Sequence, residues 1–381
     1  MRSSKEGKVM KKKVFLASVI GTVLLFSGAD SAKKPTIAPL PDRPPEPKDN
    51  PTTPEKVELG KLLYFDPRLS GDGSTSCATC HDPNHGWGKK RVMSPAYPEN
   101  KHFRHSPTVL NVAYNTLMFW DGRVKGLEEQ AMKPIASPFE MNMNYQLLEE
   151  RLKKVPKYRE MFKKAFPEDK EPITIENIVK AIAAFERTIV CNDSPFDKYM
   201  RGDKNAMDEL QIKGMNLFVG KAGCVQCHNG PNFTDEKFHV TGVPKHKVED
   251  DALVKATRNF VLRGQGFKNP DSIDRDLGLY FITKKEKDKG AFKTPSLRNV
   301  ALTPPYMHNG VFRSLEEVVE FYNKGGGDVP NKSKKLKPLN LTEEEKEALV
   351  AFLEALTCET LPQIEEPELP PYEEEIAKGG G

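Results

Sequence analysis

Apolar residues recur at helical spacing in four stretches of the chain, and these stretches form two similar pairs. The first pair is residues 52–65, where Thr53 and Pro54 are typical of a helix start, and residues 174–189. The apolar face of residues 174–189 consists of Ile175, Ile178, Val179, Ile182, Phe185 and Ile189. The second pair is residues 208–220 and residues 342–357, where Thr342 and Glu345 form a capping box. Its last helix has the apolar positions Leu349, Phe352, Leu353 and Leu356.

A glycine occupies the same place in the first helix of each pair. Gly60 precedes Leu63 and Tyr64, and Gly214 precedes Leu217 and Phe218 at the same offsets. A small residue there would let the first helix of each pair cross the last one closely. No segment alternates strongly enough to predict a large sheet, so we expect an all-α fold with short hairpins at most in its second half.

The two ends of the chain have compositions unlike the rest. Residues 1–29 begin with Lys and Arg, continue with an apolar run from Val14 to Phe26 and end with small residues, which is typical of a secretory signal peptide. Residues 30–52 are rich in proline and predict an extended linker. Residues 363–381 carry six Glu against one Lys and predict a disordered acidic tail.

Net charge gives no sign of nucleic-acid binding. The 381-residue chain has a formal charge of +4, and cleavage after Ala29 would remove six Lys or Arg and one Glu, which leaves −1. The basicity therefore belongs to the export signal, and we expect a periplasmic protein that touches a membrane only if the signal stays uncleaved. Export also places Cys191 and Cys358 where a disulfide can form, although sequence leaves the choice between a bridge and two free thiols open.

Two Cys-x-x-Cys-His motifs follow the first helix of each pair. The first attachment motif is Cys77, Cys80 and His81, and the second is Cys224, Cys227 and His228. A c-type haem uses this pattern, because two thiols bond the porphyrin and the next imidazole reaches the iron. A zinc site would need four ligands, and a redox dithiol would not need the histidine. We therefore predict two cytochrome-c-like helical domains, residues 53–190 and 191–362, each with one covalent c-type haem.

The segments around both motifs resemble one known superfamily. The segments "SPTVLNVAYNTLMFWDGR", "EEQAMKPI", "SPFDKYMRGD" and "TPSLRNVALTPPYMHNG" are similar to the bacterial dihaem cytochrome c peroxidase and MauG superfamily, over residues 53–357. The resemblance implies that Glu140 is the distal acid–base group of a peroxide-cleaving first haem. It also implies that Pro134 shapes this pocket and that Trp120 relays electrons between the haems.

The distal ligand of the second iron separates the branches of the superfamily. Residues 314–322 predict a helix capped by Ser314 and Glu317, with Leu315, Val318, Val319 and Tyr322 on one face. Tyr322 falls where the peroxidase branch has an axial methionine and MauG an axial tyrosine. We expect Tyr322 to be the ligand, with Met307 as the competing candidate; without the resemblance, the tyrosine would be interpreted as core packing.

Two positions depart from the family pattern. His85 lies only four residues after His81, a tether too short to reach the distal face easily, so we expect an open first haem and a structural His85. The family also holds calcium through backbone oxygens matching Thr303 and Pro305, but His105 stands where the family has an asparagine. Histidine is a poor calcium ligand, which puts that ion in doubt.

Three functions fit these residues. The leading one is a peroxidase that reduces hydrogen peroxide with electrons from a small soluble donor, either a c-type cytochrome or a copper protein. The second is a MauG-like oxidase that modifies residues of a partner protein through a high-valent dihaem state. The third is a dihaem electron carrier with no enzymatic activity. The sequence does not set the oligomeric state, and a homodimer is one alternative.

Overall fold

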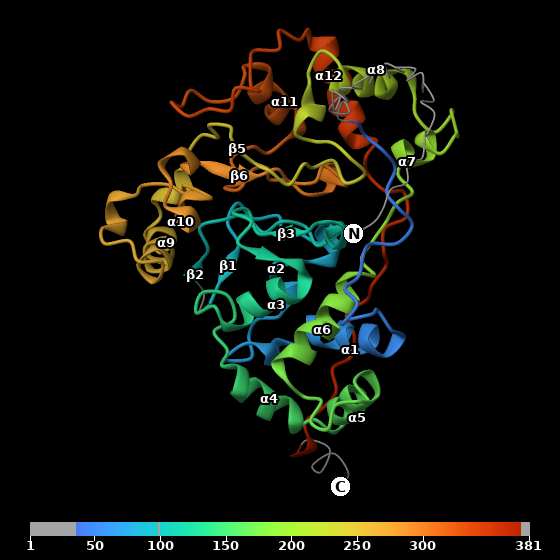
Figure 1. Ribbon diagram of the computed structural model, residues 1–381, viewed down its shortest axis with the longest axis vertical. Helices are drawn as coiled ribbons and strands as arrows, with labels where there is room; N and C mark the ends of the chain where they lie inside the picture. Colours follow the sequence, from blue (N-terminus) through green and yellow to red (C-terminus); the bar gives the residue numbers. More distant parts are fainter. Residues whose placement is uncertain (1–35, 98–99, 375–381) are drawn as a thin grey trace, which may run out of the picture. The chain divides into compact units, whose positions relative to one another are not determined.

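The structure, a computed structural model, describes residues 36–97 and 100–374 (Figure 1). The expected signal peptide lies outside these residues, as do residues 375–381 of the acidic tail. The described residues fall in a single compact unit that begins at Pro35. Within them, no helix is both long and apolar enough to cross a membrane.

Helices dominate both halves of this unit, as the hydrophobic pattern predicts. The helices of the first half are α1 (Pro54–Phe65), α2 (Cys77–Cys80), α3 (Gly126–Ala136), α4 (Tyr145–Lys153), α5 (Pro156–Ala165) and α6 (Ile175–Glu186). Those of the second half are α7 (Pro195–Met200), α8 (Glu209–Val219), α9 (Ala252–Gly264), α10 (Tyr280–Thr283), α11 (Leu315–Asn323) and α12 (Glu343–Glu354).

Strands are short and pair only as antiparallel hairpins or two-stranded ladders in the described residues. The pairs are β1 (Pro95–Ala96) with β2 (Asn100–Lys101), β3 (Leu117–Met118) with β4 (Val124–Lys125), and β5 (Phe238–Val240) with β6 (Ala291–Lys293). In the longest pair, His239 lies opposite Phe292. No large sheet is present among these residues, as expected from the weak alternation of the sequence. The pairs β1–β2 and β3–β4 lie in the first half, however, where the sequence predicted no hairpin, because strands of two residues are too short to show alternation.

The first and last helices of each half cross with their backbones in contact. A Cβ added at Gly60 of α1 would lie 1.9 Å from the carbonyl oxygen of Ala181 in α6. A Cβ at Gly214 of α8 would lie 1.8 Å from the corresponding oxygen of Ala348 in α12. Any larger side chain would therefore push the helices apart. The predicted close crossing is confirmed in both halves, and α1 and α6 are seen together in Figure 1.

Each crossing is the centre of its own hydrophobic core. In the first core, Tyr64, Trp87 and Phe185 pack edge to face, with ring centroids 5.3–6.2 Å apart. In the second core, Phe218 and Phe352 pack in the same way, with centroids 5.2 Å apart. The similar arrangement of the two cores matches the internal repeat of the sequence.

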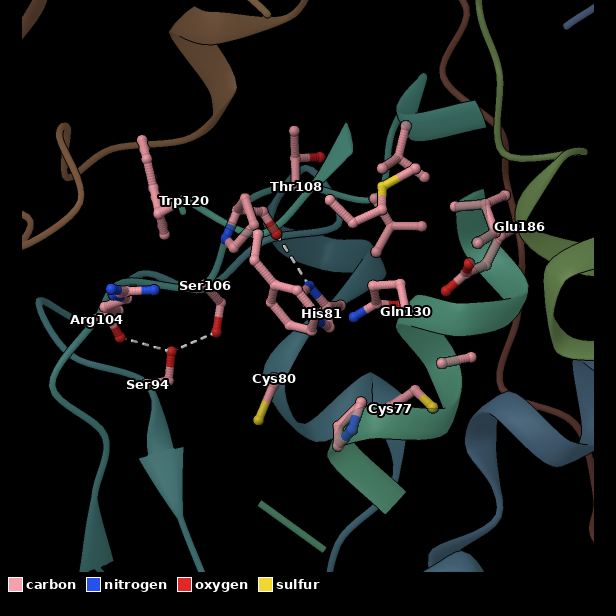
Figure 2. A pocket seen from close by; sticks show the side chains of 18 of the residues that line it. Cys77, Cys80, His81, Ser94, Arg104, Ser106, Thr108, Trp120, Gln130 and Glu186 are labelled. Atoms are coloured by element: carbon pink, nitrogen blue, oxygen red, sulfur yellow. Dashed lines mark hydrogen bonds between the residues drawn. The ribbon is translucent and has the colours of Figure 1, made fainter. Parts of the chain in front are cut away.

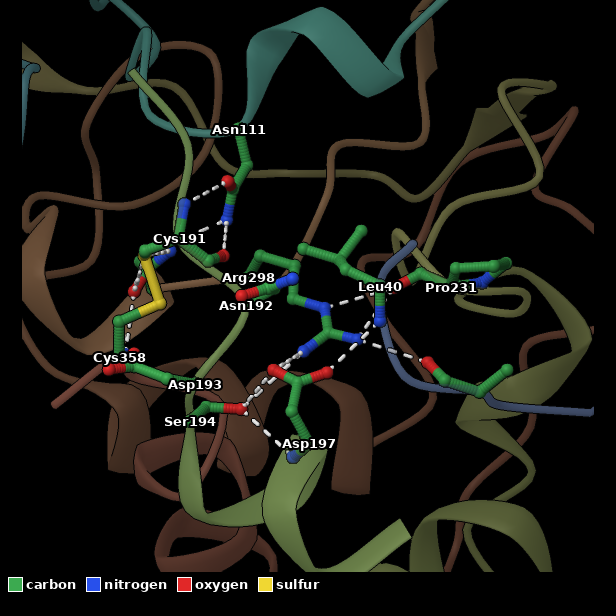
Figure 3. A network of polar contacts seen from close by, with 12 residues as sticks. Leu40, Asn111, Cys191, Asn192, Asp193, Ser194, Asp197, Pro231, Arg298 and Cys358 are labelled. Carbon is green, nitrogen blue, oxygen red and sulfur yellow. Dashed lines mark hydrogen bonds and ion pairs between the residues drawn. A yellow bond between two sulfur atoms is a disulfide. The ribbon is translucent and has the colours of Figure 1, made fainter. Parts of the chain in front are cut away.

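A disulfide joins the ends of the two last helices. Cys191, five residues after α6, is bonded to Cys358, four residues after α12, with Cα atoms 6.2 Å apart (Figure 3). Asn111 binds the backbone of Cys191 through both its amide atoms, at 2.8 and 2.9 Å. Asn299 accepts a hydrogen bond from the Cys358 amide at 2.9 Å, in a corresponding arrangement. The structure thus decides in favour of the bridge, which the sequence left open.

The two chain ends each pack on the core of the opposite half. The proline-rich segment is extended, but Leu40 is buried and its amide donates to Asp197 of α7 at 3.0 Å. At the other end, Leu361, Ile364 and Tyr372 pack against the first core. In Figure 1 the blue N-terminal and red C-terminal segments run past one another along the helical side of the molecule.

The order of residues 363–374 differs from the expected disorder. The Arg68 guanidinium donates to the carbonyl oxygen of Pro370 at 2.8 Å and lies 5.0 Å from the ring centre of Tyr372. Glu373 forms an exposed ion pair with Arg159. The high proportion of Glu predicted disorder, but a few apolar side chains and one guanidinium are enough to hold this segment on the core.

The glycine crossing gives a stability prediction. Replacing Gly60 with Ala should destabilise the protein by at least about 3 kcal/mol, because the new methyl group must displace the backbone of α6. Gly264 at the end of α9 is the matched control, since a Cβ there has no heavy atom within 4 Å. Gly264→Ala should change the free energy of unfolding by less than about 1 kcal/mol. Urea unfolding of both variants tests this, and equal stability of the two would contradict the crossing.

Candidate functional site

The first attachment motif is held on a single helical turn. Ser76 caps α2 through a reciprocal arrangement with Thr79, and the His81 amide donates to the carbonyl oxygen of Cys77 at 3.0 Å. This turn brings the Cys77 and Cys80 thiols and the His81 imidazole to the wall of one cavity (Figure 2). A short helix is the physical reason for the Cys-x-x-Cys-His spacing, since residues three and four apart lie on one face.

Each motif histidine has one ring nitrogen committed to the backbone. The Nδ1 atom of His81 lies 2.9 Å from the carbonyl oxygen of Pro107, and that of His228 lies 3.0 Å from the carbonyl oxygen of Phe233. Nδ1 therefore carries the proton and Nε2 is left as the metal-binding atom. Burial lowers the pKa of both histidines to about 4, so both are in the neutral form that binds iron.

The cavity next to His81 has the chemistry that a haem requires. It has a volume of about 220 Å³. Its apolar walls include Leu110, Met118, Leu127, Ala131 and Ile182. Two thiols, an unbonded imidazole nitrogen and a largely apolar lining are the features that attach and shelter a c-type haem. The residues present therefore fit this group.

All three residues predicted for the peroxide chemistry line this cavity. Pro134 lies in the last turn of α3, and Glu140 follows in the next turn, where its amide donates to the Ser137 carbonyl oxygen at 3.0 Å. Trp120 lies in the β3–β4 hairpin, and its indole N–H donates to the carbonyl oxygen of His105 at 2.9 Å. The structure thus brings these three side chains to the first motif, although Glu140 comes 63 positions after Cys77 in the chain.

A second chamber adjoins the haem cavity. It measures about 420 Å³ and shares four residues with the first: His102, Arg104, Arg123 and Glu140. Glu140 therefore lies on the wall between the two spaces. His102 was not singled out from the sequence, because a histidine in a loop between two motifs carries no spacing signal.

Arg104 anchors the hairpin that carries Trp120. This buried guanidinium donates to Asp121 at 2.6 Å and to Asp276 at 2.5 Å. Arg123 pairs with the same Asp121 at 2.8 Å. Although burial opposes ionisation, the two arginines lower the pKa of Asp121 to about 2. Asp121, the residue after Trp120, is thus ionised at any physiological pH and held in place by these ion pairs.

Glu186 is a site residue that the sequence analysis missed. It ends α6, is 6% exposed and lines the haem cavity beside Cys77, as Figure 2 shows. Its Oε2 atom has no hydrogen-bond partner among the described residues. Burial, opposed by Arg187, raises its pKa to about 8. The sequence did contain a signal for this residue. Glu186 is four positions after Ile182, so the helical phase of α6 places it on the buried apolar face.

Tyr322 lies beside the second attachment motif. Burial raises the pKa of its hydroxyl, and the Cys227 and Cys224 thiols add to this effect. Ser314 caps α11 as predicted, by accepting from the Glu317 amide, but the Glu317 carboxylate accepts from the amide of Arg313 and not from Ser314. Met307, the competing candidate, lies in a loop with a left-handed backbone conformation. The structure thus places the predicted tyrosine on the predicted helix.

The positions that depart from the family pattern have their own partners. His85 binds Asp82 through Nδ1 at 2.8 Å and is not among the residues that line the haem cavity. The His105 ring binds the carbonyl oxygen of Arg91 at 2.9 Å. In the described part of the chain, the only cluster of three His, Cys or acidic side chains at metal-binding distance is Cys227, Asp235 and His239. Calcium at Thr303 and Pro305 stays a prediction, and we base no step on it.

Comparison with known proteins identifies the family. Residues 54–205 match the model of the di-haem cytochrome c peroxidase family. The chain is 45% identical over 360 residues to cytochrome-c peroxidase IdrP1 of Pseudomonas sp. (strain SCT), covering 93% of this chain and 94% of that protein. This chain belongs to the di-haem cytochrome c peroxidase family.

Other members of the family extend the comparison to MauG. The methylamine utilization protein MauG of Methylorubrum extorquens is 43% identical over 328 residues, which is 85% of each chain. The crystal structure of a MauG-like protein associated with microbial copper homeostasis has a TM-score of 0.73 and 32% identity, over 84% of this chain and 95% of that one. The peroxidase and MauG branches are thus both related to this chain, which is an oxidoreductase with a helix-rich fold. Relatives named as peroxidases argue against the non-enzymatic electron carrier.

Glu186 gives a prediction about stability and pH. Its folded pKa of about 8 lies above the ordinary 4.5, so the folded state keeps a proton that the unfolded state releases. The stability of the native protein should therefore fall as pH rises from 4.5 to 8. Glu186→Gln cannot ionise and should not lose this stability. Between pH 4.5 and pH 8, the variant should therefore gain up to about 5 kcal/mol of unfolding free energy relative to the native protein, at 1.36 kcal/mol per pKa unit.

Denaturant unfolding of both proteins at pH 4.5, 6 and 8 measures the difference. Glu176→Gln is the matched control, because this carboxylate lies on α6 too but is exposed. A difference between native and Glu186→Gln protein that does not change with pH would contradict the buried, unpartnered state of Glu186.

Proposed function

We propose that this chain is an exported, periplasmic peroxidase that reduces hydrogen peroxide to water with electrons from a small soluble redox protein. The observation that carries the proposal is the presence of Glu140 in the same cavity as the His81 imidazole and the two attachment thiols. Relatives that bear the name cytochrome-c peroxidase support it. The signal-like pattern of residues 1–29 supports the location.

The cysteines and histidines of the two motifs would hold the two haems. Cys77 and Cys80 would bond one porphyrin and Cys224 and Cys227 the other, with His81 and His228 as proximal ligands through Nε2. When bound, the first haem supplies an iron at which the O–O bond of peroxide can be broken. The carbonyl oxygens of Pro107 and Phe233 keep both imidazoles oriented, and burial keeps them neutral.

Glu140 has the position required to move protons. The overall reaction consumes one hydrogen peroxide, two protons and two electrons and yields two waters. Glu140 would take the proton from the near oxygen of peroxide and deliver it to the far oxygen, so that water can leave. Because Glu140 also borders the second chamber, it can recover a proton from that side.

An aromatic series leads from the haem cavity toward the second half. The ring of Trp120 lies 6.5 Å from that of His308, which stacks on Phe292 of β6 at 3.7 Å. The backbone oxygen of Trp120 accepts from the amide of Lys293 in the same strand, at 2.9 Å. Trp120 would relay electrons between the two haems along this contact.

A MauG-like activity on a partner protein is the second candidate, and Tyr322 favours it. An anionic phenolate stabilises a more oxidised haem iron, whereas the thioether of methionine raises the reduction potential. Tyr322 lies beside both attachment cysteines of the second motif. With this ligand the second haem would share oxidising equivalents with the first, which suits the oxidation of a protein substrate.

The role of Glu140 is tested by Glu140→Gln. This change should slow peroxide cleavage by about 10²- to 10⁴-fold, the usual contribution of a positioned acid–base group. Stopped-flow absorption after mixing with hydrogen peroxide measures the rate, and the pyridine haemochrome assay checks that both haems remain. Glu129→Gln is the control, because Glu129 borders only the second chamber. An unchanged rate in the Glu140→Gln variant would show that another group moves the proton.

The role of Tyr322 is tested by two substitutions. Tyr322→Phe should change the absorption spectrum of the second haem, and Tyr322→Met should raise its reduction potential by on the order of 0.1 V or more, within the range of about 0.8 V that axial ligands span. Potentiometric titration measures this potential. Tyr306→Phe is the control, since Tyr306 is a tyrosine of the same half that packs against the second core. A second-haem spectrum untouched by Tyr322→Phe would leave Met307 as the ligand to test.

A further inference from the structure

The loop between α11 and α12 is strongly basic. Residues 324–338 contain five lysines and a single acidic residue, Asp328. Lys334, Lys335 and Lys337 in this loop are exposed, and so is Lys237 just before β5. We call these four residues the lysine patch. A lysine run of this kind is usually only a solvated surface, so its position on the fold decides whether it has a role.

The lysine patch lies against the second attachment motif. The ammonium group of Lys335 donates to the carbonyl oxygen of Gln226 at 2.8 Å and lies 3.7 Å from the sulfur of Cys227. Cys227 would carry one of the two thioether bonds to the second haem. The patch therefore lies beside a residue that would attach that haem.

The backbone holds the basic loop in a fixed position. The amides of Gly327 and Ser333 donate to the carbonyl oxygens of Thr241 and Val240, both at 2.9 Å, along β5 and the residue that follows it. The amide of Leu339 donates to the carbonyl oxygen of Asn323 at the end of α11, at 2.9 Å. The lysines are thus presented from a loop that is tied to both the strand and the helix of the second half.

The positive charges of the patch are almost uncompensated. Lys335 lies 3.8 Å from Asp235, and none of the other three lysines has a carboxylate oxygen within 4.0 Å among residues 36–97 and 100–374. Elsewhere in the same half, Lys213 of α8 and Lys221, two residues after that helix, do pair with glutamates of α12. Other surface lysines of this half thus form ion pairs within the protein, whereas, among the described residues, the lysines of the patch other than Lys335 do not.

We propose that the lysine patch is the docking surface for a small redox protein with an acidic face, which delivers electrons to the second haem. This inference rests on the proposed function and specifies the donor by its charge. Each encounter oxidises one donor and transfers one electron, so two encounters supply the two electrons that one peroxide consumes. Opposite charges on the two surfaces accelerate association and align the donor with the haem edge, an effect that salt weakens.

A matched pair of probes tests the charge requirement. Zinc-substituted cytochrome c is basic, and succinylation of its lysines makes the same protein acidic. Fluorescence titration of the di-haem holoenzyme at low ionic strength should show tighter binding of the succinylated probe, with an affinity that falls as salt is added. The double variant Lys334→Glu/Lys337→Glu should weaken this binding at least tenfold and reduce its dependence on salt.

The double variant Lys163→Glu/Lys170→Glu is the matched control. Both lysines are exposed, lie in or near α5 by the first core and make no ion pair among the described residues, so the change in net charge is identical. This variant should bind the succinylated probe like the native protein. Equal weakening by both double variants would mean that net charge alone governs binding, which would overturn the docking surface.

Two further measurements separate the outcomes. Peroxide turnover with a small-molecule reductant tests the proposed peroxidase function without any docking. If the native protein shows no turnover but still binds the succinylated probe through the patch, only the proposed function is overturned. Normal turnover with no preference for the succinylated probe would defeat only the docking surface. Size-exclusion chromatography without a probe examines self-association: a dimer abolished by Lys334→Glu/Lys337→Glu would assign the patch to contact between copies and overturn the proposal.

Discussion

The contact between helix backbones at Gly60 and Gly214 is the constraint on which the rest of this structure depends. In each half, the absence of a side chain lets the first helix lie directly on a carbonyl oxygen of the last helix. Aromatic rings then close around the crossing, and in each half the attachment motif follows the first helix. The turn of the first motif holds its thiols and imidazole on one cavity wall because the helix before it is fixed in this way.

The junction between the halves limits their relative movement, which would serve the proposed electron transfer. The Cys191–Cys358 disulfide, the two asparagines that bind its backbone and the exchanged chain ends all tie one core to the other. Arg104 adds a buried link, since it joins Asp121 beside Trp120 to Asp276 of the second half. Electron transfer between two fixed cofactors depends steeply on their separation, so a rigid junction suits the proposed relay through Trp120.

Charge is distributed differently at the two motifs, in keeping with two different tasks. Around the first motif, two carboxylates line the cavity: Glu140 also borders the second chamber, and the Oε2 atom of Glu186 is buried with no hydrogen-bond partner among the described residues. Around the second motif, the lysine patch reaches the sulfur of Cys227 from the surface. Proton chemistry needs carboxylates in a sheltered space, whereas docking of a protein needs exposed charge, and the two halves separate these requirements although they share one helical plan.

The sequence by itself determined the local features of this protein, because these depend on residues close together in the chain. Helix phase and caps predicted α1, α6, α8, α11 and α12, and the spacing of Cys77, Cys80 and His81 predicted one turn with three groups on one side. Resemblance to a family added Glu140, Trp120 and Tyr322, which no local pattern would have selected.

The tertiary structure alone decided which groups meet across the chain. It closed the disulfide, buried the Oε2 atom of Glu186 with no hydrogen-bond partner in the part of the chain that the structure describes, placed Lys335 beside Cys227 and held residues 363–374 on the first core. These outcomes depend on burial and on distances between remote segments, and composition and periodicity contain neither quantity.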